Sequence, residues 1–369
     1  MKILIYGDAS PASGGWCYAE TLRDMGHEVL QVRADELLQH YQFAIIFRVF
    51  RKIAGRIRHC DRLRHAAYLH NTAEQFRPEI IIVIKGLHLS YIDVVKLRKL
   101  GAWVCNLNHD DFFSLNHYNW SRIQRDAIPA YDYIFTTREV NVEEVRPLNG
   151  NVAFFPFAYY PRIHRVVPVA DDEISLWGAD VVFVGTYEAQ RATALEYLVK
   201  HINARLVIHG DQWYRLPRGS HLRKCVQTRD LRFDAFAKAL GGAKIALGFL
   251  RKQNRDDYTQ RTFEIPACGG VLLAERTARH QAFFREGVEA EFFDADSPAE
   301  LCQKVQMLLQ NDSKRESIRQ AGHAALIRQK HTYQDRLEKL LETFARCSRQ
   351  ANANQVGAAV PSPVPTKAE

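Results

Sequence analysis

The sequence predicts an α/β protein made of two doubly wound, Rossmann-like domains that face each other across a cleft. Three observations lead to this prediction. Strand-like and helix-like segments alternate along the first half of the chain, the alternation resumes in the second half, and a proline-marked irregular stretch at 151–176 separates them. Strands separated by helices are typical of parallel sheets covered on both faces. A chain of 369 residues also exceeds one ordinary core and fits two domains.

The first half of the chain begins directly with a strand. The run at 78–85 is apolar over most of its length, as expected of a parallel strand that is buried on both faces. The predicted strands are 2–6, 27–32, 78–85, 102–107, 131–136 and 152–157, and the predicted helices are 14–25 and 91–100.

The second half repeats this pattern. Its predicted strands are 181–184, 204–209, 243–248 and 291–293, with helices at 190–201 and 233–240 and amphipathic helices from 298 to about 346. The sequence therefore predicts a first domain at 1–160, a second domain at 161–330 and a last helix at 331–349. Residues 350–369, which are rich in Ala, Pro, Asn and Ser, are predicted to form a disordered tail.

The composition indicates a soluble globular protein with excess positive charge. Hydrophobic residues make up 47% and charged residues 25% of the chain, and no run approaches the ~20 apolar residues of a membrane-spanning helix. The amino terminus lacks the form of a signal peptide. The net charge of +8 suits an anionic partner such as a nucleotide or a phospholipid surface. Nucleic acid is the least favoured partner, because no nucleic-acid-binding motif appears.

The cysteines argue against a structural metal. The seven cysteines are scattered and lack metal-ligand spacing, which predicts reduced thiols inside a cell and no zinc site.

One stretch in the second half carries the strongest functional signal. Residues 261–275 read Arg-Thr-Phe-Glu-Ile-Pro-Ala-Cys-Gly-Gly-Val-Leu-Leu-Ala-Glu, so Glu264 lies in a short helical segment that ends at Gly269 and Gly270. A carboxylate between Phe263 and Ile265 needs a partner, because burying it unpaired costs several kcal/mol. A helix cap is the alternative, but the place of Glu264 in a second α/β unit favours ligand contact. The glycine pair would let the backbone approach a ligand closely.

Ligands of open parallel sheets bind outside the carboxyl ends of the strands, so site residues are expected in the loops that follow them. Gly14 and Gly15 close the loop after the first strand and can offer backbone N–H groups, although this loop is not a dinucleotide fingerprint. The sequence favours a substrate-facing loop on the acceptor side, and a structural turn is the alternative. His109 or Asp110, after the strand at 102–107, could act as general base on an acceptor hydroxyl. A helix cap and a satisfied turn explain these two residues almost equally well, and their position at the carboxyl end of a strand slightly favours function.

Two strand-end loops of the second half could bind a nucleotide. Gly185 and Thr186 follow the strand at 181–184, and Arg191 lies in the next helix, so this turn can bind a diphosphate. A solvated arginine is the alternative. His209 and Gly210 follow the next strand, where a base or ribose could lie, but this signal is weak.

A charged run precedes the Glu264 segment. Lys252, Arg255 and Arg261 flank Thr259 near a helix start, which suits a diphosphate, although a solvated charged loop is the usual explanation of such a run. The Asp-x-Asp pattern at 294–296 is typical of metal-dependent sugar transfer. It precedes a helix start, however, so capping explains it better and no metal is predicted.

Residues 43–65 form a cationic amphipathic pattern in which Asp61 is the only acid. Such a helix can lie on an anionic lipid surface. A helix packed on the core with a basic outer face is at least equally compatible.

At 182–191, and above all at 261–275, the chain resembles the group 1 glycosyltransferases of the spore-maturation, CgeB-like type. Those proteins carry a similar Arg-Thr-Phe-Glu-Ile-Pro-Ala-x-Gly-Gly stretch, followed by an apolar strand and an acidic residue. The resemblance extends from about Tyr131 to about Thr343 and is weaker over the first 130 residues. It implies a GT-B fold, a nucleotide-sugar donor on the second domain, an acceptor-side first domain and no metal or other cofactor. It also implies that the last helix crosses back toward the first domain.

The resemblance further implies roles for individual residues. In related retaining enzymes two acids lie eight positions apart, and the second contacts the donor ribose. Glu264 matches the second acid. Asp256 falls at the first and is the catalytic candidate there, but the wider pattern has Glu at this position, which leaves retention or inversion of the anomeric centre open. The implied diphosphate ligands are Arg191, Lys252, Arg255 and Arg261.

The sequence therefore predicts a metal-independent glycosyltransferase that moves a sugar from a nucleotide-sugar to an acceptor hydroxyl, in cell-surface or spore glycoconjugate synthesis. A cytoplasmic location is expected, with or without contact of 43–65 with the inner face of the cell membrane. Two alternatives stay open: a sugar-nucleotide epimerase, and a non-catalytic GT-B-shaped nucleotide-sugar-binding or coat-assembly protein. The sequence does not identify the sugar, the nucleotide or the acceptor.

Overall fold

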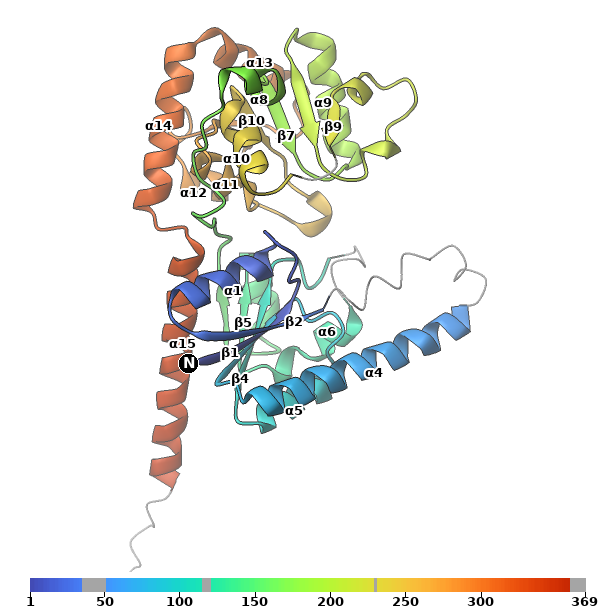
Figure 1. Cartoon of the computed structure of the whole chain (residues 1–369), viewed down its shortest axis with the longest axis vertical. Helices are drawn as coiled ribbons and strands as arrows, with labels where there is room; N and C mark the ends of the chain where they lie inside the picture. Colours follow the sequence, from blue (N-terminus) through green and yellow to red (C-terminus); the bar gives the residue numbers. More distant parts are fainter. Residues whose placement is uncertain (35–50, 115–120, 229–230, 359–369) are drawn as a thin grey trace, which may run out of the picture.

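The computed structural model describes residues 1–34, 51–114, 121–228 and 231–358, which form two α/β domains stacked along the long axis of the molecule (Figure 1). Each domain has a six-stranded sheet with parallel strand pairs. The strand orders are β2-β1-β3-β4-β5-β6 and β12-β11-β10-β7-β8-β9. In both sheets the direction of winding reverses beside the first strand of the domain, which defines the doubly wound arrangement. The predicted fold class is confirmed.

The strands are short and their apolar runs are buried. β3, for example, is Ile-Ile-Ile-Val-Ile and is buried at every position, because helices cover both faces of the sheet. The strands of the first domain are β1 (Lys2–Gly7), β2 (Glu28–Arg33), β3 (Ile80–Ile84), β4 (Trp103–Asn108), β5 (Tyr133–Thr136) and β6 (Val152–Phe154). Those of the second are β7 (Val181–Val184), β8 (Leu206–His209), β9 (Val226–Thr228), β10 (Ile245–Gly248), β11 (Leu272–Glu275) and β12 (Glu291–Phe293).

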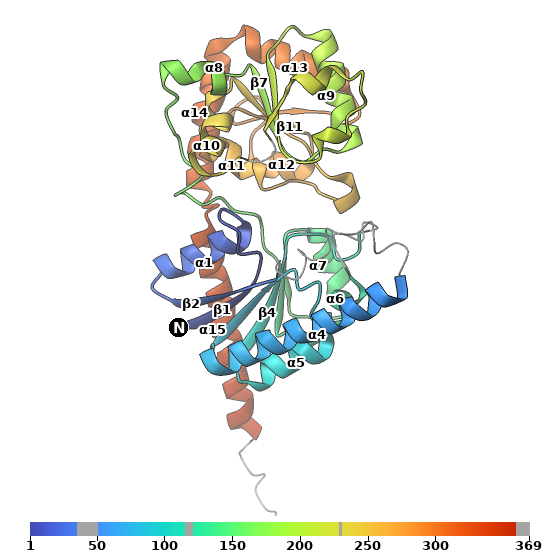
Figure 2. The same cartoon turned by 45° about the vertical axis from the view of Figure 1, so that its right-hand side comes forward.

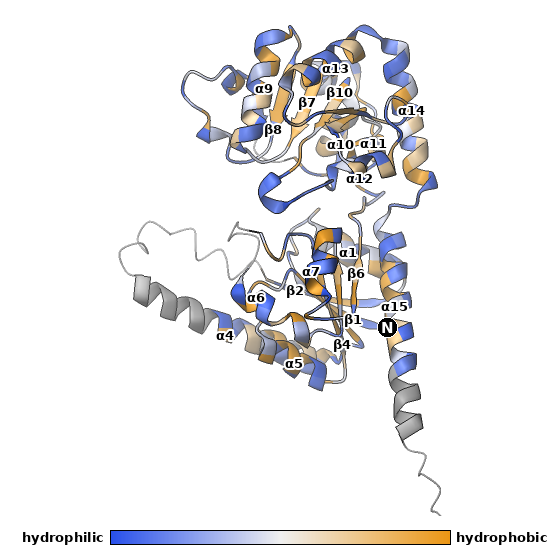
Figure 3. Cartoon of the chain, turned by 180° about the vertical axis from the view of Figure 1, so that it is seen from behind, coloured by the Kyte–Doolittle hydropathy of each residue, from blue (hydrophilic) through white to orange (hydrophobic). Residues whose placement is uncertain are grey.

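Helices flank both sheets. In Figure 3 the strands carry hydrophobic colours, whereas much of the outer helical surface is hydrophilic. The first-domain helices are α1 (Gly14–Asp24), α4 (Arg51–Phe76), α5 (Tyr91–Lys99), α6 (Arg122–Asp126) and α7 (Glu139–Val145). The second-domain helices are α8 (Ile174–Trp177), α9 (Ala189–His201), α10 (Phe233–Gly242), α11 (Arg261–Ala267), α12 (Ala278–Phe283), α13 (Pro298–Gln310) and α14 (Asp312–Arg328), and the last helix is α15 (Tyr333–Ala358).

The chain crosses between the domains twice, and the two crossings lie side by side. The backbone N–H of Tyr159 donates to the carbonyl of His331 at 3.0 Å, and the N–H of Tyr333 donates to the carbonyl of Tyr159 at 3.1 Å. These bonds join the segment that leaves the first domain to the segment that returns to it.

After the second crossing, α15 runs along the first domain (Figure 2). Its residues Tyr333, Leu337 and Leu340 are buried in one cluster with Ile3 and Ile5 of β1. The last helix therefore completes the core of the domain in which the chain begins.

Two segments differ from the sequence predictions or lie partly outside the described residues. The helix α15 continues to Ala358, although the disordered tail was expected from residue 350; this stretch contains no proline, which would end a helix, and the prolines of the tail begin only at 361. Residues 43–50 of the predicted amphipathic segment lie outside the described residues. Further along that segment, Arg62 of α4 pairs with Asp93 of α5 at 3.0 Å. Contact with a membrane stays a prediction. In the described part of the chain, no helix has the length and apolar character needed to span a membrane.

Candidate functional site

A cavity of about 380 Å³ lies where the two domains meet. The loop after β1 lines it from the first domain, and the starts of α10 and α11 line it from the second. Ile163 and His164, from the first crossing segment, complete the lining. The cavity is therefore placed at the carboxyl ends of strands, where doubly wound sheets bind ligands.

Glu264 lies in the first turn of α11 and faces this cavity with a nearly buried side chain. One carboxylate oxygen, Oε2, contacts the guanidinium of Arg261, and the other, Oε1, lies 3.3 Å from Nε2 of His164. The buried carboxylate thus has the partners that its sequence context required.

Arg261 is fixed by the second domain but remains partly open to the cavity. Its Nε donates to the carbonyl of Val184 at 3.1 Å, and its guanidinium stacks on the ring of Phe236 at 4.6 Å. The side chain is 30% exposed, so its charge is accessible to an anion.

Two adjacent glycines let the end of the loop after β1 pack closely against the backbone of Asp8 and the ring of His109. A Cβ on Gly15 would lie 2.1 Å from the carbonyl oxygen of Asp8, and one on Gly14 would lie 3.3 Å from the ring of His109. Ser13 caps α1 by accepting a hydrogen bond from the N–H of Trp16 at 3.2 Å. Residues 8–14 line the cavity, except for Ala9, and contact of this loop with a ligand stays a prediction.

His109 follows β4 and packs among aromatic rings. Its Nε2 lies 3.3 Å from the hydroxyl of Tyr18, and its ring stacks on that of Tyr18 at 5.7 Å. Burial lowers the pKa of His109 to about 4, and the nearby positive charges of Lys85 and Arg138 act in the same direction. The imidazole is therefore neutral at pH 7.

Asp110 is already engaged in two contacts. Lys85 Nζ lies 2.5 Å from its Oδ2, and the amide of Asn254, from the second domain, donates to its Oδ1 at 3.2 Å. Although burial acts to raise the pKa of Asp110, Lys85 and Arg138 hold it below its usual value. This carboxylate links the domains in the structure.

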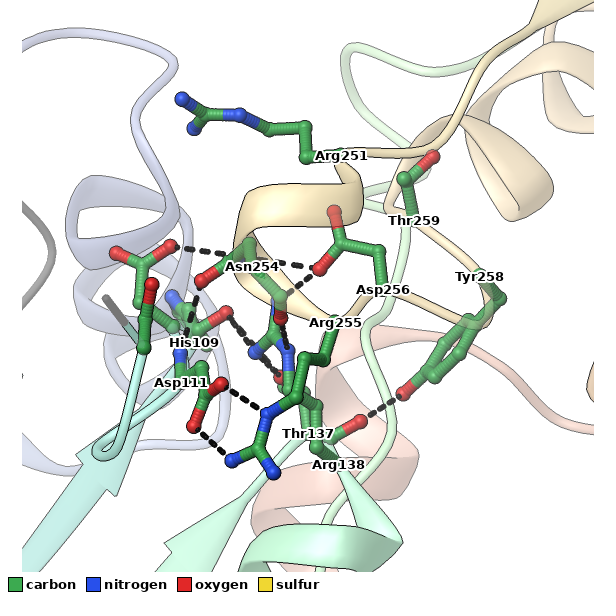
Figure 4. A network of polar contacts seen from close by, with 12 residues as sticks. His109, Asp111, Thr137, Arg138, Arg251, Asn254, Arg255, Asp256, Tyr258 and Thr259 are labelled. Carbon is green, nitrogen blue, oxygen red and sulfur yellow. Dashed lines mark hydrogen bonds and ion pairs between the residues drawn. The ribbon is translucent and has the colours of Figure 1, made fainter. Parts of the chain in front are cut away.

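Arg255 and Asp256 also face the first domain (Figure 4). Arg255 donates to both oxygens of Asp111, at 2.5 and 2.7 Å, and to both oxygens of Glu144, at 2.8 Å. Asp256 forms an ion pair with Arg138. The expected diphosphate contact of Arg255 and the expected acid of the reacting centre at Asp256 are not what this geometry shows. The loop turns its side chains toward the other domain, a choice that sequence position does not reveal.

Arg191 organises its own loop. Its Nη1 donates to the carbonyl of Thr186 at 3.1 Å and lies 3.6 Å from Glu188, and the side chain is buried. Gly185 and Gly210 pack against each other, because a Cβ on Gly210 would lie 2.1 Å from the carbonyl of Gly185. These residues shape the strand ends of β7 and β8.

The remaining donor candidates are separated from one another. His209 is buried at the end of β8, which lowers its pKa to about 4. Lys252 is half-exposed and pairs with Asp296 at 2.8 Å. The backbone N–H of Thr259 donates to the hydroxyl of Thr262 at 3.2 Å, which orders the start of α11.

The glycine pair has a structural role that differs from the predicted one. Gly269 and Gly270 lie at the amino end of β11, away from the strand ends that line the cavity. A Cβ on Gly270 would lie 2.8 Å from the carbonyl of Leu240, and Gly269 has a φ of +75°. The close backbone approach is therefore to α10, and not to a ligand.

The Asp-x-Asp pattern forms a turn just before α13, and the residue that caps this helix is Ser297. Asp294 Oδ1 accepts from the N–H of Asp296 at 2.9 Å, and Ser297 caps α13 through the N–H of Glu300 at 3.2 Å. Among the residues that the structure describes, no group of three or more metal-ligating side chains is found.

Comparison with known proteins identifies the architecture. Residues 190–342 match the family model described as "Glycosyl transferase-like". The structure resembles Anabaena HepE in complex with UDP (TM-score 0.59, 13% identity, 94% of this chain and 100% of that chain). It also resembles the sucrose-phosphate synthase of Thermosynechococcus elongatus (TM-score 0.64, 10% identity, 96% and 100%). A glycosyltransferase from Rickettsia africae gives a TM-score of 0.63 at 11% identity (94% and 98%).

The chain has the GT-B fold. No curated protein matches the sequence at a significant level. In this GT-B protein the family-model match covers the second domain from α9 onward and includes Glu264 and Arg261.

Three residues around the GT-B cleft were not predicted as site residues. Glu275, the last residue of the 261–275 stretch, is buried at the carboxyl end of β11, and burial raises its pKa to about 7. Its position after an apolar strand was a usable signal. His164 and Arg138 carried no comparable signal, because only the folded chain brings them to Glu264 and Asp256.

Proposed function

We propose that this GT-B protein is a glycosyltransferase that binds a nucleotide-sugar in the interdomain cavity and transfers the sugar to an acceptor hydroxyl. One observation carries the proposal: the Glu264 carboxylate and the partly exposed Arg261 guanidinium line the same cavity at the strand ends. A carboxylate can accept hydrogen bonds from sugar hydroxyls, and a guanidinium suits a diphosphate.

In the proposed mechanism, Glu264 holds the donor ribose and Arg261 neutralises the charge that develops on the leaving diphosphate. Fixed cationic groups at a leaving group stabilise the transition state strongly, because they need no reorganisation during the reaction. We propose this role for Arg261 in place of a metal ion. Lys252 stays a weaker candidate because it already pairs with Asp296.

On the acceptor side, His109 is the proposed residue that contacts the attacking hydroxyl. It lies next to Gly14 of the cavity-lining loop and is neutral at pH 7, so it can accept a proton or donate a hydrogen bond. The ion pair with Lys85 makes Asp110 the weaker candidate for this role.

The subgroup, the biological role, the donor and the cellular location are proposals as well. The match of 261–275 to the CgeB-like pattern supports that subgroup, and with it a role in cell-surface or spore glycoconjugate synthesis. The similar protein HepE binds UDP, and UDP together with glucose, in its crystal structures. We therefore place UDP-linked hexoses first among the donors to test, for a protein that works in the cytoplasm.

The test combines binding and turnover. Thermal unfolding with UDP-, GDP-, ADP- and dTDP-linked sugars is expected to reveal one donor class, since a ligand at 100 times its Kd stabilises a protein by about 2.7 kcal/mol. Glu264→Gln is expected to lose most of this stabilisation. Glu143→Gln, on an exposed side chain that pairs only with Arg146 in the described residues, is the matched control.

The outcomes separate the candidate functions. Transfer or hydrolysis of the sugar supports a glycosyltransferase, whereas an isomerised nucleotide-sugar would indicate an epimerase. Stabilisation without turnover would indicate a binding protein. Unchanged donor binding in Glu264→Gln would exclude the proposed ribose contact.

A further inference from the structure

We propose that His164 is a positioning residue that fixes the orientation of the Glu264 carboxylate for a vicinal diol. The inference rests on the proposed function, because it concerns the same donor site. His164 comes from the segment that leaves the first domain, whereas Glu264 belongs to α11 of the second domain.

The hydrogen bonds of the ring determine which nitrogen of His164 carries the proton. The backbone N–H of Tyr160 donates to Nδ1 at 3.0 Å, so Nδ1 accepts and carries no proton. In the neutral ring the proton is then on Nε2, which lies 3.3 Å from Oε1 of Glu264. The protonated Nε2 therefore faces the carboxylate at contact distance.

The ring is held rigidly by its own turn. The N–H of His164 donates to the carbonyl of Tyr160 at 2.8 Å, so the two residues bond reciprocally. The ring lies 5.5 Å from that of Phe236, which also stacks under Arg261. Only 5% of the His164 side chain is exposed, and burial lowers its pKa, which favours the neutral form.

Tyr160 anchors this turn to the first domain. Its side chain is buried in the cluster that contains Ile3 and Leu337, and its hydroxyl donates to Asp24 at 3.2 Å. The orientation of Glu264 is therefore set partly from the first domain. A change in the relative position of the domains would reach the donor ligand through His164.

The two contacts leave acceptor capacity on both carboxylate oxygens. Each oxygen has two lone-pair positions. Arg261 hydrogen-bonds to Oε2, and His164 lies against Oε1. One position on each oxygen remains for a ligand, which matches the two hydroxyls of a vicinal diol. A nucleotide with ribose fits this pattern better than one with 2′-deoxyribose, which offers a single hydroxyl.

The binding test compares His164→Phe with His164→Gln, because Gln retains a donor for Glu264. The probes are UDP, GDP and ADP and their 2′-deoxy counterparts. We expect His164→Phe to weaken the best ribonucleotide about tenfold and to reduce its preference over the deoxy form. We expect His164→Gln to stay within about threefold of the wild type. Ribonucleotide affinity of His164→Phe equal to that of the wild type would overturn the proposal.

A matched control separates positioning from general destabilisation. His280 is another buried histidine beside α11, bonded to Thr262 at 2.9 Å and to the carbonyl of Glu275 at 2.7 Å, without a contact to Glu264. We expect His280→Phe to lower the melting temperature and to bind the nucleotide with an affinity within about threefold of that of the wild type. A tenfold loss of affinity in His280→Phe as well would contradict a specific role of His164.

A second measurement needs no nucleotide. Nitrogen-15 NMR of the imidazole at pH 7 is expected to show His164 protonated at Nε2 and unprotonated at Nδ1. A charged ring or the opposite tautomer would overturn the proposed contact between Nε2–H and the carboxylate. If no nucleotide binds the wild type, the proposed function fails, and the NMR result alone decides whether His164 presents a protonated Nε2 to Glu264.

Discussion

Arg138 of the first domain forms an ion pair with Asp256 of the second, and the two side chains are only 3% and 4% exposed. Arg138 also donates to the carbonyls of Asn254, at 2.8 Å, and His109, at 2.6 Å. One buried guanidinium thus holds the loop after β10 against the loop after β4. This contact is one of several that fix the relative position of the two domains.

We expect Arg138→Met to lower the free energy of unfolding by about 3–5 kcal/mol, because it leaves the Asp256 carboxylate buried without its cation. Urea unfolding measures this change. The double variant Arg138→Met/Asp256→Asn is expected to recover part of the loss, since no buried charge remains. Arg146→Met removes an exposed partner of Glu143 and should change stability by less than about 1 kcal/mol. Similar losses for Arg138→Met and Arg146→Met would contradict this view of the interdomain pair.

Because His109 is neutral in the folded protein, we expect the free energy of unfolding to fall at acidic pH. Its pKa is lowered to about 4 in the folded protein, against about 6.5 in the unfolded chain. Between these values the unfolded chain binds the extra proton, so stability falls as the pH falls from about 6.5 toward 4. Between pH 7.5 and pH 5, the free energy of unfolding of the wild type should fall by about 2 kcal/mol more than that of His109→Gln. Urea unfolding measures both. An equal loss in both proteins would show that His109 titrates normally.

For Glu275 we expect the opposite effect, a free energy of unfolding that falls as the pH rises. Burial raises its pKa to about 7 in the folded protein, against about 4.5 in the unfolded chain. The folded protein retains the proton in this window, so the contribution of Glu275 to stability falls as the pH rises from about 4.5 to 7. The free energy of unfolding of Glu275→Gln, measured relative to that of the wild type, should therefore be about 2 kcal/mol higher at pH 8 than at pH 5. A difference between the two proteins that is independent of pH would exclude the raised pKa.

The loop after β1 is expected to tolerate no side chain at Gly15. In Gly15→Ala the new Cβ would lie 2.1 Å from the backbone oxygen of Asp8, so the cavity-lining loop must shift. Such overpacking costs about 1–3 kcal/mol, and a loss of donor or acceptor binding should accompany it. Gly150→Ala is the control, because no atom lies within 4 Å of its Cβ position. A fully active and stable Gly15→Ala would show that this loop adapts without cost.

The sheets were predictable because parallel strands buried on both faces have continuous apolar sequences. The strand at 181–184 was predicted with its observed bounds, and the strand at 78–85 contains β3, Ile80–Ile84. Glu264 was predictable for a similar reason, since a carboxylate within an apolar segment needs partners.

The direction in which loop side chains face was not predictable. The run at 251–261 contains three arginines, yet Arg261 lines the cavity while Arg255 faces Asp111 of the first domain. Sequence spacing does not distinguish them, because the difference arises from a turn in which Arg255 has a φ of +48°. The glycine pair was predicted to contact a ligand for a related reason. A glycine that packs against another helix and one that packs against a ligand look the same in sequence.

The packing of α15 on β1 has a consequence for the order of folding during synthesis. Domains generally fold from the amino terminus as the chain emerges. The first domain has all six strands once residue 154 has emerged, but one face of its sheet still lacks Leu337 and Leu340. α1 covers part of that apolar face, and the part under α15 stays exposed on the ribosome until the second domain has been made. We therefore expect a chaperone to bind the nascent first domain at this stage.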